Sequence, residues 1–285
     1  MLQCGNQIVD IQHFPDGTLL MHQEIEGRGE KFRKCTGNDT DKAYDVPEEQ
    51  AEITWLYDNN EELVALFFLV SHLRSKGVKN LTLYMPYIPN ARQDRVKRPE
   101  DVFTLKYFAE MINSLKFDKV TVLDPHSYVS EALIDHIGVE TPVRYVEEVL
   151  KRIGKEVILF YPDEGAMKRY SSMFPLPYVF GIKKRDWISG EIKGLEVAGQ
   201  TEQLKGRDIL IIDDICSKGG TFYYSAKALK ELGAGEIYLY VSHCENTITE
   251  GQLLTTDDIT KIYTTGSIYR SNHDKIEVIT GVYER

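Results

Sequence analysis

Residues 211–221 carry polar groups with a clear chemical use directly after an apolar stretch. Asp213 and Asp214 end this stretch, and a short loop with Gly219 and Gly220 leads into a segment of helical periodicity. Glycines let backbone amides approach a phosphate, a helix N-terminus favours negative charge, and carboxylates can accept hydrogen bonds from sugar hydroxyls. This order is typical of ligand sites in open α/β sheets. It predicts a ligand site formed by Asp213, Asp214, Ser217, Lys218, Gly219, Gly220 and Thr221.

Each such segment also has an ordinary structural explanation. The acidic pair could be solvated at a plain strand-to-helix turn, and a phenylalanine such as Phe14 in a turn commonly packs into a core. A lone histidine such as His126 is more often structural than a ligand, and the basic run at Lys183–Arg185 would by itself suit a solvated loop. The elements around these residues, and their order along the chain, must therefore be considered together.

From residue 53 onward, short apolar strands alternate with amphipathic helices, which is the pattern of a parallel sheet covered by helices on both faces. The first helix has a capping-box signature, Asn59 followed by Glu62, and Gly77 supplies a left-handed stop. Helices are also expected at 103–115, 145–153 and 221–232. Strands are expected at 81–87, 120–124, 157–161, 178–182, 209–213 and 237–242.

This order fits an α/β fold of two tandem units, and we place the boundary at 143/144. The first 50 residues differ, because alternating stretches around Gly17, Gly27, Gly29 and Gly37 predict a β-rich start with long turns. The sequence therefore predicts two similar α/β domains, 1–143 and 144–285, with a strand-rich beginning.

Composition limits the classes of partner. The 285 residues are 42% hydrophobic and carry a formal net charge of −10, which argues against a nonspecific nucleic-acid or anionic-membrane surface. The longest apolar run, Leu63 to Val70, is far shorter than the roughly 20 residues that cross a bilayer. Reduced thiols are expected for the four cysteines. We expect a cytoplasmic protein that binds small phosphorylated ligands in a local pocket.

Residues 211–221 resemble the phosphoribosyl-binding loop of the type I phosphoribosyltransferase fold, which transferases share with phosphoribosyl pyrophosphate synthetases. Five further segments resemble the synthetases, that is, the ribose-phosphate pyrophosphokinase family. They are similar to its adenine-binding hairpin, ATP-contacting segment, metal-binding strand end, pyrophosphate-binding turn and the start of its catalytic loop. In that order they are His13–Gly17, Ala91–Arg95, Leu123–Ser127, Tyr161–Gly165 and Ile182–Arg185, and Thr264–Ile268 matches a late strand of the family.

The resemblance implies a Mg²⁺-dependent transfer of the β,γ-diphosphoryl group of ATP to the anomeric hydroxyl of a phosphoribosyl acceptor, with release of AMP. Residues 1–143 would bind ATP, and residues 144–285 would bind the acceptor and pyrophosphate. Catalysis would fall to Lys183, Arg185 and His126, and Mg²⁺ binding to His126 and Asp163. ATP would contact Phe14, Asp16, Arg92, Gln93, Asp94 and His126.

Several differences from the family leave alternatives open. The family loop usually has Asp-Thr where this chain has Ser217 and Lys218, so the local charge rises by about two units. Ribose 5-phosphate is the default acceptor, but this change would also suit the diphosphate of ADP-ribose in NAD salvage; a solvent-facing Lys218 is the plain explanation. Thr18 replaces a glutamate that is common in the family, which leaves one adenine contact open. A phosphoribosyltransferase, or a noncatalytic regulator of a synthetase, is the alternative of another class.

The expected partners are ATP and the acceptor, together with further copies of the chain in a homo-oligomer of two or more. The chain has thirteen residues before Phe14 and ends at Arg285 without the family's usual final helix. We therefore expect a smaller assembly than in the family and weak regulation by ADP and phosphate. The segment 186–200 is expected to be a loop whose glycines permit closure.

Overall fold

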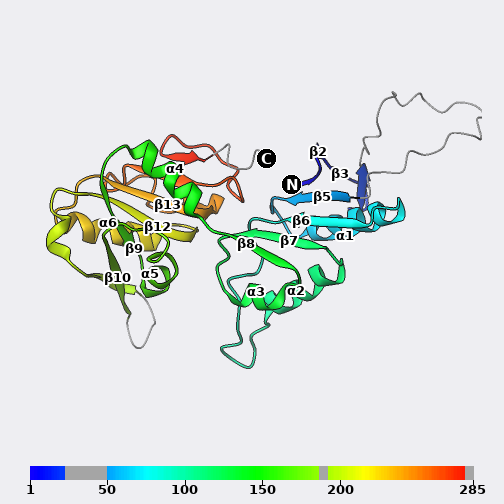
Figure 1. The fold of residues 1–285 in the computed structure, drawn as a ribbon, viewed down its shortest axis with the longest axis horizontal. Coiled ribbons are helices and arrows are strands. Elements are labelled where there is room, and N and C mark those ends of the chain that lie inside the picture. The colour runs from blue at the N-terminus through cyan, green and yellow to red at the C-terminus, as the bar shows by residue number, and fades with distance from the viewer. Residues whose placement is uncertain (23–49, 186–191, 280–285) are drawn as a thin grey trace, which may run out of the picture. The chain divides into compact units, whose positions relative to one another are not determined.

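The computed structural model describes residues 1–22, 50–185 and 192–279; for residues 183–185 and 192–194 it describes the backbone alone. The chain divides into two compact units, Met1–Glu140 (unit 1) and Thr141–Arg285 (unit 2). Each unit contains its own sheet and helices (Figure 1). Both sheets are mainly parallel, which confirms the predicted α/β class.

The sheet of unit 1 has the strand order β2-β1-β5-β6-β7-β8. Strands β5 to β8 are parallel, whereas β1 pairs antiparallel with both β2 and β5. A separate two-stranded hairpin, β3 (Asp10–His13) and β4 (Leu19–His22), makes the beginning of the chain strand-rich, as predicted. The sheet strands are β1 (Leu2–Cys4), β2 (Gln7–Ile8), β5 (Gln50–Trp55), β6 (Asn80–Tyr84), β7 (Lys119–Leu123) and β8 (Ile137–Glu140).

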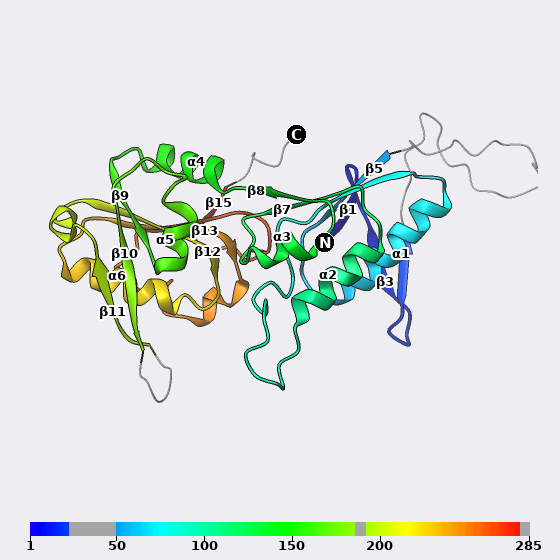
Figure 2. The ribbon, with the colours of Figure 1, turned by 60° about the horizontal axis from the view of Figure 1, so that its bottom comes forward.

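Helices α1 (Glu61–Ser75) and α2 (Thr104–Ser114) lie along the same side of this sheet (Figure 2). A short helix, α3 (Val129–Leu133), follows β7. Burial alternates along β6, where Leu81 and Leu83 are buried and their neighbours are half-buried or exposed. Among the described residues of unit 1, this alternation is typical of a sheet with one face covered by helices such as α1 and α2.

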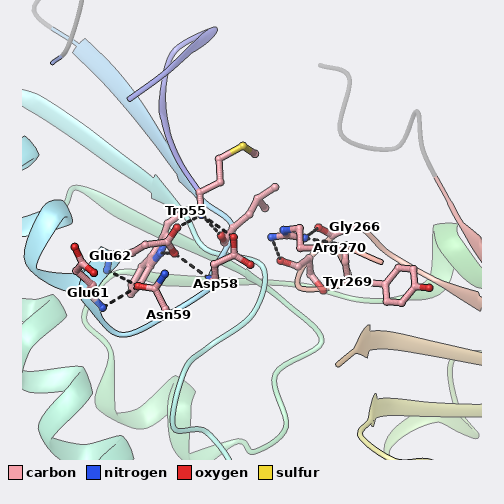
Figure 3. A network of polar contacts seen from close by, with 11 residues as sticks. Trp55, Asp58, Asn59, Glu61, Glu62, Gly266, Tyr269 and Arg270 are labelled. Carbon is pink, nitrogen blue, oxygen red and sulfur yellow. Dashed lines mark hydrogen bonds and ion pairs between the residues drawn. The ribbon is translucent and has the colours of Figure 1, made fainter. Parts of the chain in front are cut away.

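The start of α1 is fixed by the carboxylate of Glu62, which the sequence predicted to take part in a capping box with Asn59. Asn59 lies directly before the N-cap residue Asn60, and its Oδ1 accepts hydrogen bonds from the backbone amides of Glu61 and Glu62 at 3.0 and 3.3 Å. The Glu62 side chain instead turns to the core (Figure 3). It accepts hydrogen bonds from Trp55 Nε1 and from the Asp58 amide, both at 2.9 Å, and from the Met1 ammonium group. Glu62 thereby ties α1 to β5 as well as to its own first turn.

The sheet of unit 2 has the order β11-β10-β9-β12-β13-β14-β15. Strands β10 and β11 pair antiparallel, and the other described strand pairs of this sheet are parallel. All residues of β9 and β13 are buried, as expected for strands covered on both faces. Its strands are β9 (Val157–Tyr161), β10 (Tyr178–Arg185), β11 (Ile192–Ala198), β12 (Asp208–Cys216), β13 (Ile237–Cys244), β14 (Lys261–Thr264) and β15 (Ile276–Val278).

Helices α4 (Val143–Ile153), α5 (Glu164–Tyr170) and α6 (Gly220–Glu231) cover this sheet. Phe222, Ala226 and Leu229 of α6 belong to the same hydrophobic cluster as the strand residues Ile211 and Leu239. Two short 3₁₀ helices, η1 (Thr201–Leu204) and η2 (Asn246–Glu250), flank β12 and β13 in the sequence. Among the described residues no helix is long and apolar enough to cross a membrane.

Two predicted elements were wrong. The late strand expected at 264–268 is β14, which ends at Thr264, because its pairing with β13 covers residues 261–264. The loop expected at 186–200 contains strand β11, which pairs antiparallel with β10. Residues 186–191 lie outside the described part of the chain, as do the predicted turns at Gly27, Gly29 and Gly37.

Candidate active site

The predicted acidic pair lies in β12, at the carboxyl end of the sheet of unit 2. Asp214 is buried and forms an ion pair with Arg169 of α5, with 3.0 Å between its Oδ2 and Arg169 Nη1. Asp213 Oδ1 accepts a hydrogen bond from the Asp214 amide at 3.0 Å. Arg169 was not predicted from the sequence, because nothing in the local pattern of a short helix indicates a partner 45 residues away. The ion pair fixes the strand end on which Asp213 sits.

Asp213 has a raised pKa, well above its ordinary value. Burial is the main cause, and the negative charges of Asp214 and Asp163 add to it. The carboxyl groups of Asp214 in β12 and of Asp163, directly before α5, thus raise the pKa of Asp213 through their negative charge. A bound cation, or hydroxyl groups that donate hydrogen bonds, would relieve this repulsion.

Asp163 begins α5 directly after β9. It is the N-cap residue, and its Oδ1 accepts a hydrogen bond from the Ala166 amide at 3.0 Å. The predicted turn at Tyr161–Gly165 is therefore a strand-to-helix turn capped by its own acid. A β-carbon at Gly165 would lie only 3.1 Å from Asp163 Oδ1, which explains the glycine beside this carboxylate.

The predicted glycine loop (residues 217–221) joins β12 to α6. Gly219 has a left-handed backbone (φ 77°), and Gly220 begins the helix. Because the N-cap residue Gly219 has no side chain, it cannot cap the first backbone amides of α6. Ser217 Oγ donates to Glu245 Oε2 at 2.6 Å. Lys218 Nζ lies 2.8 Å from Glu250 Oε2, and this contact raises the pKa of Lys218. The loop's cation is thus exposed but already has an anionic partner.

In unit 1, Asp94 connects two of the predicted ATP-binding segments. Arg95 donates to it through two nitrogens, with Nε at 2.8 Å and Nη2 at 3.0 Å from the carboxylate oxygens. Ser127, next to His126, donates its hydroxyl to Asp94 Oδ2 at 2.7 Å. The hydrogen bond from Arg95 is the main cause that lowers the pKa of Asp94 to about 2. An ionised Asp94 therefore fastens the 92–95 segment to the residues that follow β7.

Other predicted residues of unit 1 lie around this contact. Gln93 Oε1 accepts a hydrogen bond from Thr104 Oγ1 at 2.9 Å, at the start of α2. Asp124, two residues before His126, is buried and has a left-handed backbone (φ 41°). A non-glycine residue in this conformation is uncommon and often marks a functional turn. His126 is half-buried and Arg92 is exposed.

The predicted adenine hairpin is the turn between β3 and β4. Phe14 is 48% exposed, so the core-packing explanation for this residue is wrong. Asp16 Oδ1 accepts hydrogen bonds from the Thr18 hydroxyl at 2.7 Å and from the Thr18 amide at 2.9 Å, and these bonds lower its pKa. Thr18 therefore orders the turn that presents Phe14.

The predicted catalytic residues Lys183 and Arg185 have their backbones in β10. Lys183 pairs with Leu195 and Arg185 pairs with Ile192 of β11, with an irregularity between Lys184 and Arg185. The segment is thus the first arm of an antiparallel hairpin. Gly181 in β10 leaves room for both neighbouring segments, because a β-carbon there would lie 2.7 Å from the Pro162 carbonyl oxygen after β9 and 2.9 Å from Leu195 Cδ1 of β11.

Within the described residues, no group of three or more His, Cys, Asp or Glu side chains is arranged to hold a metal ion. Mg²⁺ usually takes one or two carboxylates, several waters and phosphate oxygens of the substrate. The carboxyls of Asp163 and Asp213, whose charges act on each other, offer oxygen ligands of the kind that suits this ion.

Known proteins resemble this chain in sequence. Residues 51–115 match the N-terminal domain of ribose phosphate pyrophosphokinase, and residues 166–266 match the phosphoribosyl transferase domain. The ribose-phosphate pyrophosphokinase of Thermococcus kodakarensis is 28% identical over 238 residues, which are 82% of this chain and 77% of the relative. That of Saccharolobus solfataricus is 28% identical over 66% of this chain and 65% of the relative. That of Rhizobium meliloti is 30% identical over 66% of this chain and 61% of the relative.

The fold has a solved counterpart. The crystal structure of phosphoribosylpyrophosphate synthetase from Mycobacterium smegmatis superposes with a TM-score of 0.71 over 95% of this chain and 85% of that protein, at 17% identity. This similarity covers both units, whereas the two family-domain matches fall on separate segments, 51–115 and 166–266. Taken together with the order of the segments, these matches place the chain in the ribose-phosphate pyrophosphokinase family.

Proposed function

We propose that this chain transfers the β,γ-diphosphoryl group of ATP to the anomeric hydroxyl of a phosphoribosyl acceptor and releases AMP. The anomeric hydroxyl releases its proton to solvent and its oxygen forms a bond to the β-phosphorus. The bond from that phosphorus to the oxygen that bridges to the α-phosphate breaks, and AMP leaves with the bridging oxygen. Ribose 5-phosphate is the acceptor that we propose first, because curated relatives carry the name ribose-phosphate pyrophosphokinase.

One observation carries the proposal. In a chain of this family, the acidic end of β12 precedes the glycine loop and the N-terminus of α6, and the charge of Asp163 acts on Asp213. The end of β12 and the turn after the neighbouring strand β9 thus carry three kinds of group. They are carboxylates that can bind sugar hydroxyls, backbone amides that can bind a phosphate, and oxygen ligands for a cation. Such an arrangement supports a sugar phosphate bound next to a metal-complexed pyrophosphate.

In the acceptor half, Asp213 and Asp214 would accept hydrogen bonds from ribose hydroxyls, and the amides of residues 217–221 would hold the phosphate. Asp214 is already bound to Arg169, so Asp213 is the acid with more to gain from a donor. Its pKa is raised first by burial and then by the charges of Asp214 and Asp163, and hydroxyl donors or a cation would favour its ionised form.

In the ATP half, Phe14 would stack on adenine and Asp16 would accept from its amino group. Arg92 and Gln93 would contact the nucleotide, while Asp94 would keep this segment beside His126. Asp163 in unit 2 and His126 in unit 1 are each proposed as Mg²⁺ ligands, and the ion would supply charge neutralisation at the outer phosphates when bound. Lys183 and Arg185 would stabilise the charge that develops on the transferred group.

ADP-ribose remains a specific second acceptor, and Ser217 and Lys218 are the observation that favours it. Its diphosphate would bring additional phosphate oxygens to the glycine loop. The contact between Lys218 and Glu250 weakens this argument, because the carboxylate of Glu250 already offsets the positive charge of Lys218. We therefore rank ADP-ribose second and propose that both be tested side by side.

The deciding experiment measures AMP release from ATP and Mg²⁺ with ribose 5-phosphate and, separately, with ADP-ribose, with the mass of each product determined. Faster turnover of ribose 5-phosphate, with a product heavier by one diphosphoryl group, would support the first choice. Faster turnover of ADP-ribose would assign the chain to NAD salvage. If neither acceptor gives AMP, the pyrophosphokinase proposal is wrong, and pyrophosphate release from phosphoribosyl pyrophosphate would then test the transferase alternative.

A further inference from the structure

The first half of the glycine loop is held by one segment, residues 245–253, which we call the clasp. It begins at the end of β13, which lies beside β12 in the sheet (Figure 1), and includes η2. The Glu245 amide donates to the Cys216 carbonyl oxygen at 2.8 Å, directly before the loop. The clasp therefore starts where the loop starts.

Two glutamates of the clasp bind the two side chains that distinguish this loop from the family pattern. Glu245 Oε2 accepts from Ser217 Oγ at 2.6 Å and from Thr247 Oγ1 at 3.1 Å, so its carboxylate is held from two sides. Glu250 Oε2 lies 2.8 Å from Lys218 Nζ. A hydrogen bond to a carboxylate is stronger than one between neutral groups, and these contacts fix the position of the loop.

Backbone packing gives independent evidence of this close contact. A β-carbon at Gly251 would lie 1.8 Å from the Lys218 carbonyl oxygen, closer than nonbonded atoms can approach. At Gly219 a β-carbon would lie 2.7 Å from Leu253 Cδ2. Glycine is thus required on both sides of the contact, and the clasp leaves the loop little room to move.

The clasp also sets the charge of the loop. Lys218 contributes one positive charge, and Glu245 and Glu250 contribute one negative charge each, so the sum is −1. The Lys218 and Glu250 side chains are 65% and 56% exposed, so their attraction is weak and an incoming phosphate can compete for the lysine. Glu245, in contrast, is half-buried and bonded to a hydroxyl.

We propose that Glu245 is a positioning residue of the glycine loop and that Glu250 is a specificity-determining residue, which limits the attraction of Lys218 for the acceptor's phosphate. This inference rests on the proposed function. It predicts opposite effects for the two glutamates: loss of Glu245 weakens acceptor binding, whereas loss of Glu250 strengthens it. A purely structural role would make both losses weaken binding.

The test measures the KM for ribose 5-phosphate, or for ADP-ribose if that is the acceptor, in two single variants of the full chain, E245Q and E250Q. E250Q should lower this KM about threefold at low salt, because Glu250 would no longer compete with the acceptor's phosphate for Lys218. The gain should vanish in the K218M background and in about 0.5 M salt. E245Q should raise the KM about tenfold, and E245D should restore part of the loss. In both variants the KM for ATP should stay within about twofold.

The matched control is E202Q, which removes the same charge from an exposed residue of η1. It should leave both KM values unchanged. If E250Q leaves the acceptor KM unchanged or raises it while AMP is still released, the role of Glu250 is refuted. If E245Q keeps the wild-type KM, the role of Glu245 is refuted.

Failure of the proposed function can be told apart from failure of this inference. Without AMP release from wild type with either acceptor, the proposed function fails, while calorimetric binding of ribose 5-phosphate still tests the clasp. Tighter binding to E250Q and weaker binding to E245Q, both with wild-type unfolding midpoints, would support it. Equal weakening in both, with lowered midpoints, would show that the clasp only stabilises the fold.

Discussion

Asp94 illustrates how a single residue can connect two segments of a proposed site. Its carboxylate accepts from Arg95 and from Ser127, so the 92–95 segment and the end of β7 depend on the same ionised group. The pKa of Asp94 falls to about 2, chiefly through the Arg95 hydrogen bond, because both contacts favour the charged form. Its contribution to stability is therefore present above the ordinary pKa of an aspartate and is lost as pH falls toward the folded-state value.

D94N should lower the free energy of unfolding at pH 7 by about 1 kcal/mol, a value reduced for the exposure of Arg95. The deficit should stay constant from about pH 8 to pH 5 and shrink between about pH 4 and pH 2, since protonation then neutralises the wild-type residue as well. Urea unfolding of wild type and D94N across this pH range measures the difference in their free energies of unfolding. A deficit that persists unchanged at pH 3 would mean that ionisation of Asp94 does not stabilise the fold.

Lys183 is the residue on which the proposed chemistry depends most. K183A should reduce kcat by about 10²- to 10³-fold, because a cation that meets developing charge acts chiefly in the transition state. ATP binding should change little. K184A removes the same charge from the next residue of β10 and serves as the control, with less than about threefold loss expected. Equal losses in the two variants would remove the specific assignment to Lys183.

At the scale of elements, the sequence predicted those whose pattern is local. Strand β9 has the predicted bounds, 157–161, because a fully buried strand reads as an unbroken apolar run. The step from β12 through the glycine loop into α6 was also correct, since acids and glycines mark the end of the strand and the start of the helix. Within the candidate site, the turn at Asp163 and the exposed Phe14 likewise followed from short motifs.

Elements and contacts that depend on distant residues were missed. Strand β11 has no strong strand pattern around Gly194, and its backbone hydrogen bonds come from β10. Glu62 follows Asn59 as in a capping box, yet Trp55 and Met1 supply partners that no local motif reveals. The clasp is the same case, because Ser217 and Glu245 are 28 residues apart and meet only through the pairing of β12 with β13.

The backbone contact between the clasp and the glycine loop gives a prediction that involves no charge. G251A should raise the KM for the acceptor more than tenfold with little change for ATP, because its methyl group would displace the Lys218 carbonyl. G266A is the matched control, since a β-carbon there would meet Val278 at an ordinary 3.7 Å. Wild-type acceptor KM in a folded G251A would show that the loop tolerates displacement and that the clasp does not position it.

For the whole molecule, two separate hydrophobic clusters raise the question of how cooperatively the chain unfolds. The cluster of unit 1 includes Trp55 and Leu83, and the cluster of unit 2 includes Leu239. Trp55 is fully buried, donates to Glu62 and lies 6.2 Å from the Phe108 ring. The other tryptophan of the sequence, Trp187, lies outside the described residues. In W187F, tryptophan emission would therefore report on unit 1 alone.

We expect core defects to act within their own unit, because each unit has its own apolar core. In the W187F background, L83A should move the emission transition to lower denaturant, consistent with the roughly 2–5 kcal/mol that a buried leucine contributes. L239A removes an equally buried leucine from unit 2 and should leave that transition in place, while far-UV circular dichroism shows an earlier loss of helix and strand. If L239A instead shifts the Trp55 transition as much as L83A does, the chain unfolds as one cooperative unit. Acceptor binding in unit 2 would then stabilise unit 1 as well, and ligand-induced shifts in melting temperature could not assign a substrate to either unit.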